Sequence, residues 1–267
     1  MSSARFALLI LVIAALAGAF WFMKDELLPA DEPAPEVMVQ PEPDEPAVRL
    51  GPIHPLAPLE PGSAAEGELI PLPPLDDSDA YFLLAMTDVF GSDIGNLLVS
   101  EALIDKFVTT VDNLPRSHVA ERTRPIGRLA SNFAVTAVSD EEIYLGDANF
   151  DRYDTVVGLV TTADLDDVVD MYRRFYPLIQ ESYVRLGYPD GYFNDRAVEV
   201  IDHLLETPMP SGPIRLVRPR VLYEFADEEL ESLSSGQKLL IRMGREHTEA
   251  IKDVLRELRA RIAQTPG

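Results

Sequence analysis

Three carboxylates and an imidazole share one face of the helix that the sequence predicts at residues 194–206. At about 100° per residue, Asp195, Glu199, Asp202 and His203 lie within about 100° of one another. Such a set could hold a hard cation or supply a general acid and base. The opposite face of the same helix is apolar, which is typical of an amphipathic surface helix. We therefore interpret the polar face as mainly solvated and assign it no metal and no catalytic residue.

The turn before this helix is the better candidate for a contact surface. Tyr188 opens a turn sequence with proline at its second position and glycine at its fourth. Aromatic and amide groups exposed in a loop between two helices are plausible contact residues. The predicted ligand-binding residues are Tyr188, Asp190, Tyr192, Asn194, Asp195 and Arg196.

The spacing of apolar residues predicts the helices that position this turn. The longest is expected over residues 164–187, where an apolar stripe repeats at helical intervals and Pro177 should kink or split the helix. An earlier helix is expected to begin at a Ser100 N-cap. Two more helices should end the chain, with a break near Gly244.

Short strands are expected at 133–138 and 143–145, which would form a hairpin, and at 214–217 and 221–225. The predicted fold class is therefore mainly α (α+β). It is an orthogonal helical domain with a small antiparallel sheet, preceded by one transmembrane helix.

The predicted membrane helix is an uncharged run of 18 residues that begins at Phe6 and ends at Met23. Eighteen helical residues span about 27 Å, close to the thickness of the hydrocarbon core. Arg5 precedes the run, whereas Lys24 is followed at once by two acidic residues. The positive-inside rule then places the N-terminus in the cytoplasm and the later residues outside it. The lipid bilayer is thus the expected partner of residues 6–23.

A cleaved signal peptide is the alternative, because residues 17–19 have the small-x-small form of a cleavage site. The apolar run continues through residues 20–23 and exceeds the usual hydrophobic region of a signal peptide, which favours an uncleaved signal-anchor. In either case the rest of the chain is expected to be exported.

Residues 25–75 have the composition of an acidic, Pro-rich disordered linker. Residues 29–74 contain 13 prolines, and residues 25–79 contain 14 acidic side chains and one basic one. Such a segment buries too little apolar surface to offset its ordering entropy, and fifty extended residues reach at most about 150 Å. The predicted domains are 1–24, an anchor with a short cytoplasmic N-terminus; 25–75, the linker; and 76–265, a mainly helical periplasmic domain.

The composition also excludes several classes of protein. Cysteine is absent, which removes disulfides, thiolate zinc sites and cysteine nucleophiles. The sequence carries no Gly-x-Ser-x-Gly elbow, Gly-rich phosphate loop or His-Glu-x-x-His motif. A net charge of −22 offers no cationic footprint for nucleic acid. We expect no cofactor, no metal and no nucleic-acid partner.

Four stretches resemble a known bacterial family. They are FVTTVDNLP (107–115), YPLIQESYVRLGYPDGYFNDR (176–196), VIDHLL (200–205) and LYEFADEELESLSSGQKLLIRMG (222–244). Over about residues 75–265 the chain is similar to a family of single-span envelope proteins known only as a domain of unknown function. The resemblance implies a single-pass protein of the proteobacterial inner membrane with a periplasmic C-terminal domain. It implies no reaction, ligand or catalytic residue.

These observations favour a membrane-tethered periplasmic interaction module over an enzyme. The module would bind an envelope protein or a cell-wall component through the turn and helix start. The alternative is a cell-envelope hydrolase with Asp195, Glu199, Asp202 or Glu224 as acid and base. A carboxylate buried in a cleft with a raised pKa would favour the hydrolase, whereas exposed carboxylates on a convex surface would count against it.

Overall fold

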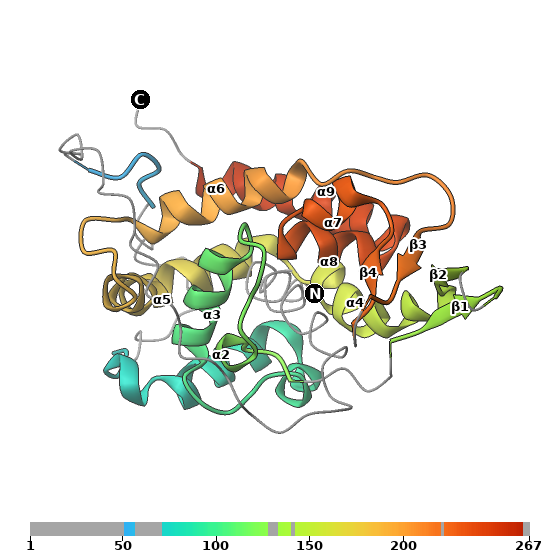
Figure 1. Ribbon diagram of the computed structural model, residues 1–267. Helices are drawn as coiled ribbons and strands as arrows, with labels where there is room; N and C mark the ends of the chain where they lie inside the picture. The colour runs from blue at the N-terminus through green and yellow to red at the C-terminus, as the bar shows by residue number, and fades with distance from the viewer. Residues whose placement is uncertain (1–50, 57–70, 128–132, 140–141, 220–221, 264–267) are drawn as a thin grey trace, which may run out of the picture.

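Figure 1 shows a computed structural model of the chain, which describes residues 51–56, 71–127, 133–139, 142–219 and 222–263. Within these residues the fold is mainly helical with one small antiparallel sheet, which confirms the predicted class. The α-helices are α2 (Asp79–Phe90), α3 (Leu103–Asn113), α4 (Asp154–Thr162), α5 (Leu165–Arg185), α6 (Phe193–Leu205), α7 (Glu228–Ser232), α8 (Ser235–Met243) and α9 (Arg245–Ile262). Short 3-10 turns lie at η2 (Leu75–Asp77), η3 (Ser92–Asn96), η4 (Glu121–Thr123), η5 (Asp147–Asn149) and η6 (Asp151–Tyr153).

The predicted membrane helix at residues 6–23 lies outside the described residues. In the part of the chain that the structure describes, none of the helices combines the length and the apolar character needed to cross a bilayer.

The helices pack around one main core. The C-terminal helix α9 packs against α4, α5, α6 and α8, while α3 packs against α2, α5 and α6. The sheet and the connection between α5 and α6 lie at opposite ends of the molecule (Figure 1). The turn singled out from the sequence is therefore remote from the sheet.

Helix α5 (Leu165–Arg185) runs as one element through Pro177, so of the two predicted outcomes, a kink or a split, the split is wrong. Pro177 is exposed, and water can satisfy the carbonyl that its missing N–H leaves free. The apolar stripe is confirmed as core over most of its length, with Tyr172, Phe175 and Ile179 almost fully buried. The stripe ends before Leu186, which is 38% exposed.

The four strands form one antiparallel sheet in the order β1 (Val135–Ala137), β2 (Ile143–Leu145), β3 (Arg215–Val217) and β4 (Glu224–Phe225). The predicted hairpin between the first two is confirmed, with Val135 opposite Leu145. Leu145, Leu216 and Phe225 bury one face of the sheet against Ile241 of α8. This second, smaller core fixes the sheet to the helical body.

Helix α3 (Leu103–Asn113) does not begin at a Ser100 cap, so that prediction is wrong. The carboxylate of Asp79, in the first turn of α2, accepts hydrogen bonds from Ala102 N at 2.7 Å and Leu103 N at 2.8 Å. Ala102 adopts the left-handed conformation with φ 51°, which turns the chain toward this distant acceptor. The cap comes from a neighbouring helix and not from the local sequence.

Candidate ligand-binding site at the start of α6

Gln180 of α5 holds the predicted turn in place. The hydrogen bond from Gly191 N to Tyr188 O, 3.1 Å long, closes the turn as its sequence predicts. The Gln180 side chain donates to Gly191 O at 2.7 Å and accepts from Phe193 N at 2.9 Å. The end of the turn and the first residue of α6 are thus fixed to the preceding helix by a single amide.

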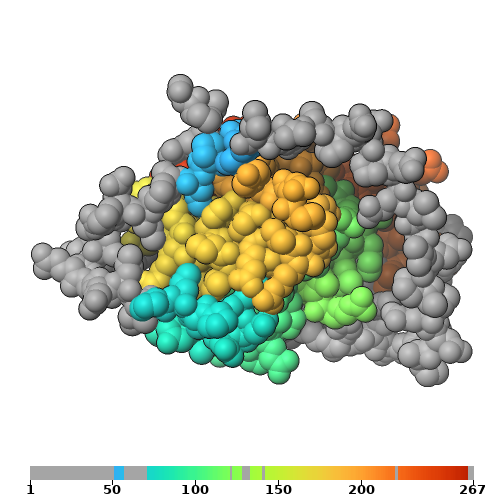
Figure 2. Space-filling view, turned by 90° about the vertical axis from the view of Figure 1, so that its left-hand side faces the viewer, coloured from blue at the N-terminus to red at the C-terminus, as the bar shows by residue number. Residues whose placement is uncertain are grey.

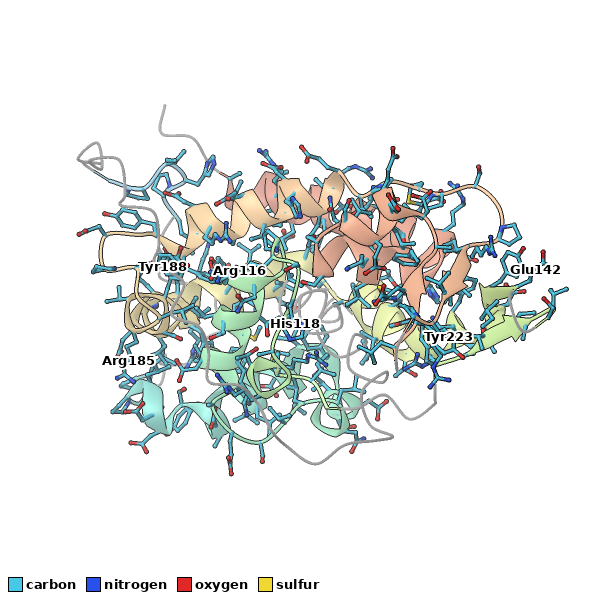
Figure 3. All side chains as sticks on the ribbon, in the orientation of Figure 1. Arg116, His118, Glu142, Arg185, Tyr188 and Tyr223 are labelled. Atoms are coloured by element: carbon cyan, nitrogen blue, oxygen red, sulfur yellow. The ribbon has the colours of Figure 1, made fainter. Side chains whose placement is uncertain are left out.

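Asp112 of α3 holds the other side of the turn. Its side chain is 3% exposed and accepts from Arg116 at 2.8 Å, Arg196 at 3.0 Å and the Tyr188 hydroxyl at 3.2 Å. Figure 3 shows Arg116 and Tyr188 close together at this end of the molecule. The Arg116 guanidinium donates to the Tyr188 hydroxyl at 3.1 Å. The pKa of Tyr188 is raised, mainly because the hydroxyl is partly buried and to a smaller extent because Asp112 is negatively charged.

Two of the six predicted contact residues therefore help to build the site. The ring of Tyr188 also stacks on Tyr183, with centroids 4.6 Å apart, so one of its faces is occupied. Arg196 donates to the Asp112 carbonyl at 2.8 Å as well as to its carboxylate. Both side chains are committed to positioning the turn.

Asn194 is buried, although an amide exposed in the loop was expected. Its oxygen accepts from the Tyr172 hydroxyl at 3.1 Å, and its backbone N–H donates to Tyr176 at 3.4 Å. Its side-chain nitrogen donates to Ile262 O at 3.0 Å and to His54 O at 2.8 Å. Asn194 therefore joins α5, α6, α9 and a segment from the predicted linker. Burial, opposed by the Asn194 N–H, raises the pKa of Tyr176 to about 12.

Asp195 binds the same linker segment, residues 51–56. Its two carboxylate oxygens accept from Ile53 N at 2.9 Å and His54 N at 2.8 Å. Figure 2 shows residues 51–56, in blue, lying against the surface formed by α5 and α6. Leu56 packs against the main core. Part of the predicted linker is thus seated on the helical domain, at the predicted contact residues.

A surface cavity of about 470 Å³ lies beside this segment. Asp190, Tyr192, Asp195 and Arg196 line it, so four of the six predicted residues share one depression. Glu199 and Asp202 also contribute to the lining. The wall carries four carboxylates and a single arginine, which favours a neutral or basic occupant.

The carboxylates proposed for hydrolysis are already engaged. Asp195 binds the two backbone N–H groups, and Glu199 pairs with Arg196 at 2.7 Å. Asp202 pairs with Arg259 of α9. Glu224 lies on β4, at the sheet end of the molecule, so the structure does not bring it to the other three.

The neighbouring histidine has a structural partner. His203 lies 2.8 Å from the hydroxyl of Ser234, which caps α8. Among the described residues, no group of three or more His, Asp or Glu side chains is arranged to hold a metal ion.

A second cavity, of about 270 Å³, lies between the loop that follows α6 and the α8–α9 junction. Phe150, Met209 and Ile241 supply apolar walls. Arg245 donates to Met209 O at 3.0 Å and to Pro210 O at 2.8 Å, which closes the loop over the helix start. None of the predicted contact residues lies there.

Sequence reasoning missed Asp112, Gln180 and residues 51–56. Asp112 carried a signal, because it directly follows the apolar stripe of α3 and an acid at the border of a buried face needs partners. The other two carried none that a single sequence reveals.

The fold and the cavity define a helical domain with one small sheet and a carboxylate-lined surface depression. The chain belongs to the family described as "Protein of unknown function (DUF3014)", whose model matches residues 103–259. Membership in a family of unknown function, suggested by the resemblance, is thereby confirmed. Neither a curated protein nor a solved structure matches the chain. The matched residues include α3, α5 and α6 but not the segment at 51–56.

Proposed function

We propose that this protein is a membrane-tethered interaction module of the bacterial cell envelope. Residues 6–23 would anchor it in the inner membrane, and the helical domain would lie in the periplasm. The domain would bind another envelope protein through the cavity at the start of α6. The observation that carries the proposal is this cavity of about 470 Å³, whose walls are fixed by Asp112 and Gln180 and carry four carboxylates.

A protein partner accounts for this surface better than a cell-wall glycan. Sugar recognition uses exposed aromatic faces, whereas Tyr183, one of the two tyrosines that line the cavity, stacks its ring on Tyr188. The acidic wall also favours basic groups, which proteins supply through lysine and arginine. A basic or neutral region of an envelope protein fits both features.

Site-directed photocrosslinking in intact cells tests the binding surface. A crosslinker at Tyr192, which lines the cavity, should capture a discrete envelope protein. The matched control is the same crosslinker at the exposed Glu142, in the hairpin at the opposite end of the molecule (Figure 3). The proposal is overturned if the two positions give the same products or if position 192 gives none.

A reporter fused to the C-terminus tests the compartment. An enzyme that is active only in the periplasm should be active in this fusion, and removal of residues 6–23 should abolish that activity. A fusion that is active only in the cytoplasm would exclude the proposed orientation.

A further inference from the structure

Residues 51–56 are recognised through their backbone. The carboxylate of Asp195 accepts hydrogen bonds from the backbone N–H groups of Ile53 and His54. The side chain of Asn194 donates to the carbonyl of His54. Residues 52 and 55 are prolines, which have no N–H and favour an extended chain. Every backbone N–H between the first proline and the second is therefore bound by one carboxylate.

The side chains of this segment are seated unevenly. Ile53 is 51% exposed, whereas Leu56 is half-buried and packs against the main core. His54 Nδ1 is shielded from solvent, and within the described residues it has no hydrogen-bond partner. A shielded polar atom without a partner weakens binding, so the segment fits the site imperfectly. Main-chain hydrogen bonds that supply affinity, beside an exposed Ile53 and a His54 nitrogen without a partner, allow a site to accept more than one sequence.

The geometry points to a peptide-binding site at the start of α6, in which residues 51–56 are the resident intramolecular ligand. This inference rests on the proposed function and names the chemistry of its partner. The partner presents an extended segment with two consecutive free N–H groups and a following carbonyl, next to proline, with neutral or basic flanks. It competes with the chain's own segment for Asp195 and Asn194.

Three further observations support a displaceable ligand. The segment lies outside the residues that match the family model, whereas Asp195 and Asn194 lie inside them. Fourteen residues, 57–70, connect it to the domain, which is enough chain for it to leave the site while staying attached. The cavity beside the segment leaves room for a longer or bulkier peptide.

A synthetic peptide tests the inference with purified components. The probe is fluorescein-labelled Gly-Pro-Ile-His-Pro-Leu amide, titrated by fluorescence anisotropy into the full chain in detergent micelles. A tethered competitor has an effective concentration of the order of millimolar, so the native chain should bind the probe weakly. Ile53→Pro removes one of the two N–H donors of the resident segment and keeps Leu56, so it should increase the affinity for the probe at least tenfold. His54→Pro removes the other donor and gives the same comparison if the first variant fails to fold.

The probe itself supplies the sharpest control. Methylation of the backbone nitrogen of its histidine removes one N–H donor without altering the protein. The affinity of the probe for the protein should then fall at least tenfold. In the Ile53→Pro chain, where the resident segment no longer competes, Asp195→Asn should reduce the affinity for the probe similarly, whereas Asp190→Asn should not, because Asp190 lines the cavity without contacting the segment's N–H groups. Equal binding of the methylated and unmethylated probes would overturn the inference, as would equal affinity of the native and Ile53→Pro chains. Because no cellular partner is needed, this result is independent of the crosslinking experiment.

Discussion

Arg196 contacts two acids in opposite environments, which allows its interactions to be separated by measurement. Asp112 is 3% exposed and 3.0 Å from Arg196, whereas Glu199 is 67% exposed and 2.7 Å away. The shorter contact is therefore the more solvated one. We predict that burial, and not distance, decides which pair stabilises the fold.

The magnitudes follow from the exposure of each partner. Removing one side of a buried, hydrogen-bonded ion pair typically costs about 3–5 kcal/mol, because the other charge is left desolvated. Arg196 is itself 18% exposed, and water can partly replace the lost acid, so Asp112→Ala should cost about 3 kcal/mol. An exposed pair three residues apart on one helix contributes about 0.3–0.5 kcal/mol. The two acids should therefore differ severalfold in coupling to the same arginine.

Double-mutant cycles on the purified chain provide the assay. Urea denaturation, followed by far-ultraviolet circular dichroism, gives the free energy of unfolding for Arg196→Ala combined with either acid variant. The expected coupling is about 2 kcal/mol with Asp112 and below about 0.5 kcal/mol with Glu199. Equal coupling energies, or the larger value for Glu199, would refute the reasoning.

Three other perturbations give separate tests. Gly244 has φ 87° and an added Cβ would lie 2.8 Å from the ring of Phe150, so Gly244→Ala should lower the melting temperature and cost about 2 kcal/mol or more. Gly158, inside α4 with open space at its Cβ position, is the control, and its alanine variant should be unchanged or up to about 1 kcal/mol more stable. Burial raises the pKa of Tyr176 from an ordinary value near 10 to about 12. The neutral hydroxyl therefore makes its full contribution to the free energy of unfolding below about pH 10, and that contribution is lost as pH rises toward 12. The melting temperature should fall over that window, and a phenylalanine variant with an equally steep fall would contradict this assignment. Asp195→Asn replaces one acceptor by a donor, so hydrogen exchange at the amides of residues 53 and 54 should accelerate about 10- to 100-fold, and an unchanged rate would exclude the carboxylate as their acceptor.

The sequence predicts those elements whose signals are local. The apolar stripe of α5 repeats along one helix, and the break at Gly244 coincides with a positive φ of 87°. The start of α3 could not be predicted from local signals, because its capping acid, Asp79, is 23 residues before Ala102. An N-cap borrowed from a packed neighbour depends on the tertiary structure, which residue spacing does not encode.

The candidate site shows the same division. The turn that begins at Tyr188 was predictable, because proline and glycine occupy the positions that such a turn requires. The contact between Ile53 and Asp195 joins residues 142 apart in the chain. Backbone N–H groups are common to nearly all residues, so the composition of a Pro-rich stretch does not reveal which of them a carboxylate will bind. Only the folded arrangement brings the two together.

The attachment of residues 51–56 to α6 also sets how far the domain can travel. If residues 6–23 are anchored in the bilayer as proposed, residues 25–50 are the chain between the bilayer and the seated segment, and these 26 residues can reach at most roughly 80 Å when extended. If Asp195 released its two N–H partners, residues 51–70 would be added to this connection, and its maximum length would nearly double. Whether Asp195 binds the chain's own segment or a partner would then set the greatest distance between the membrane and the domain.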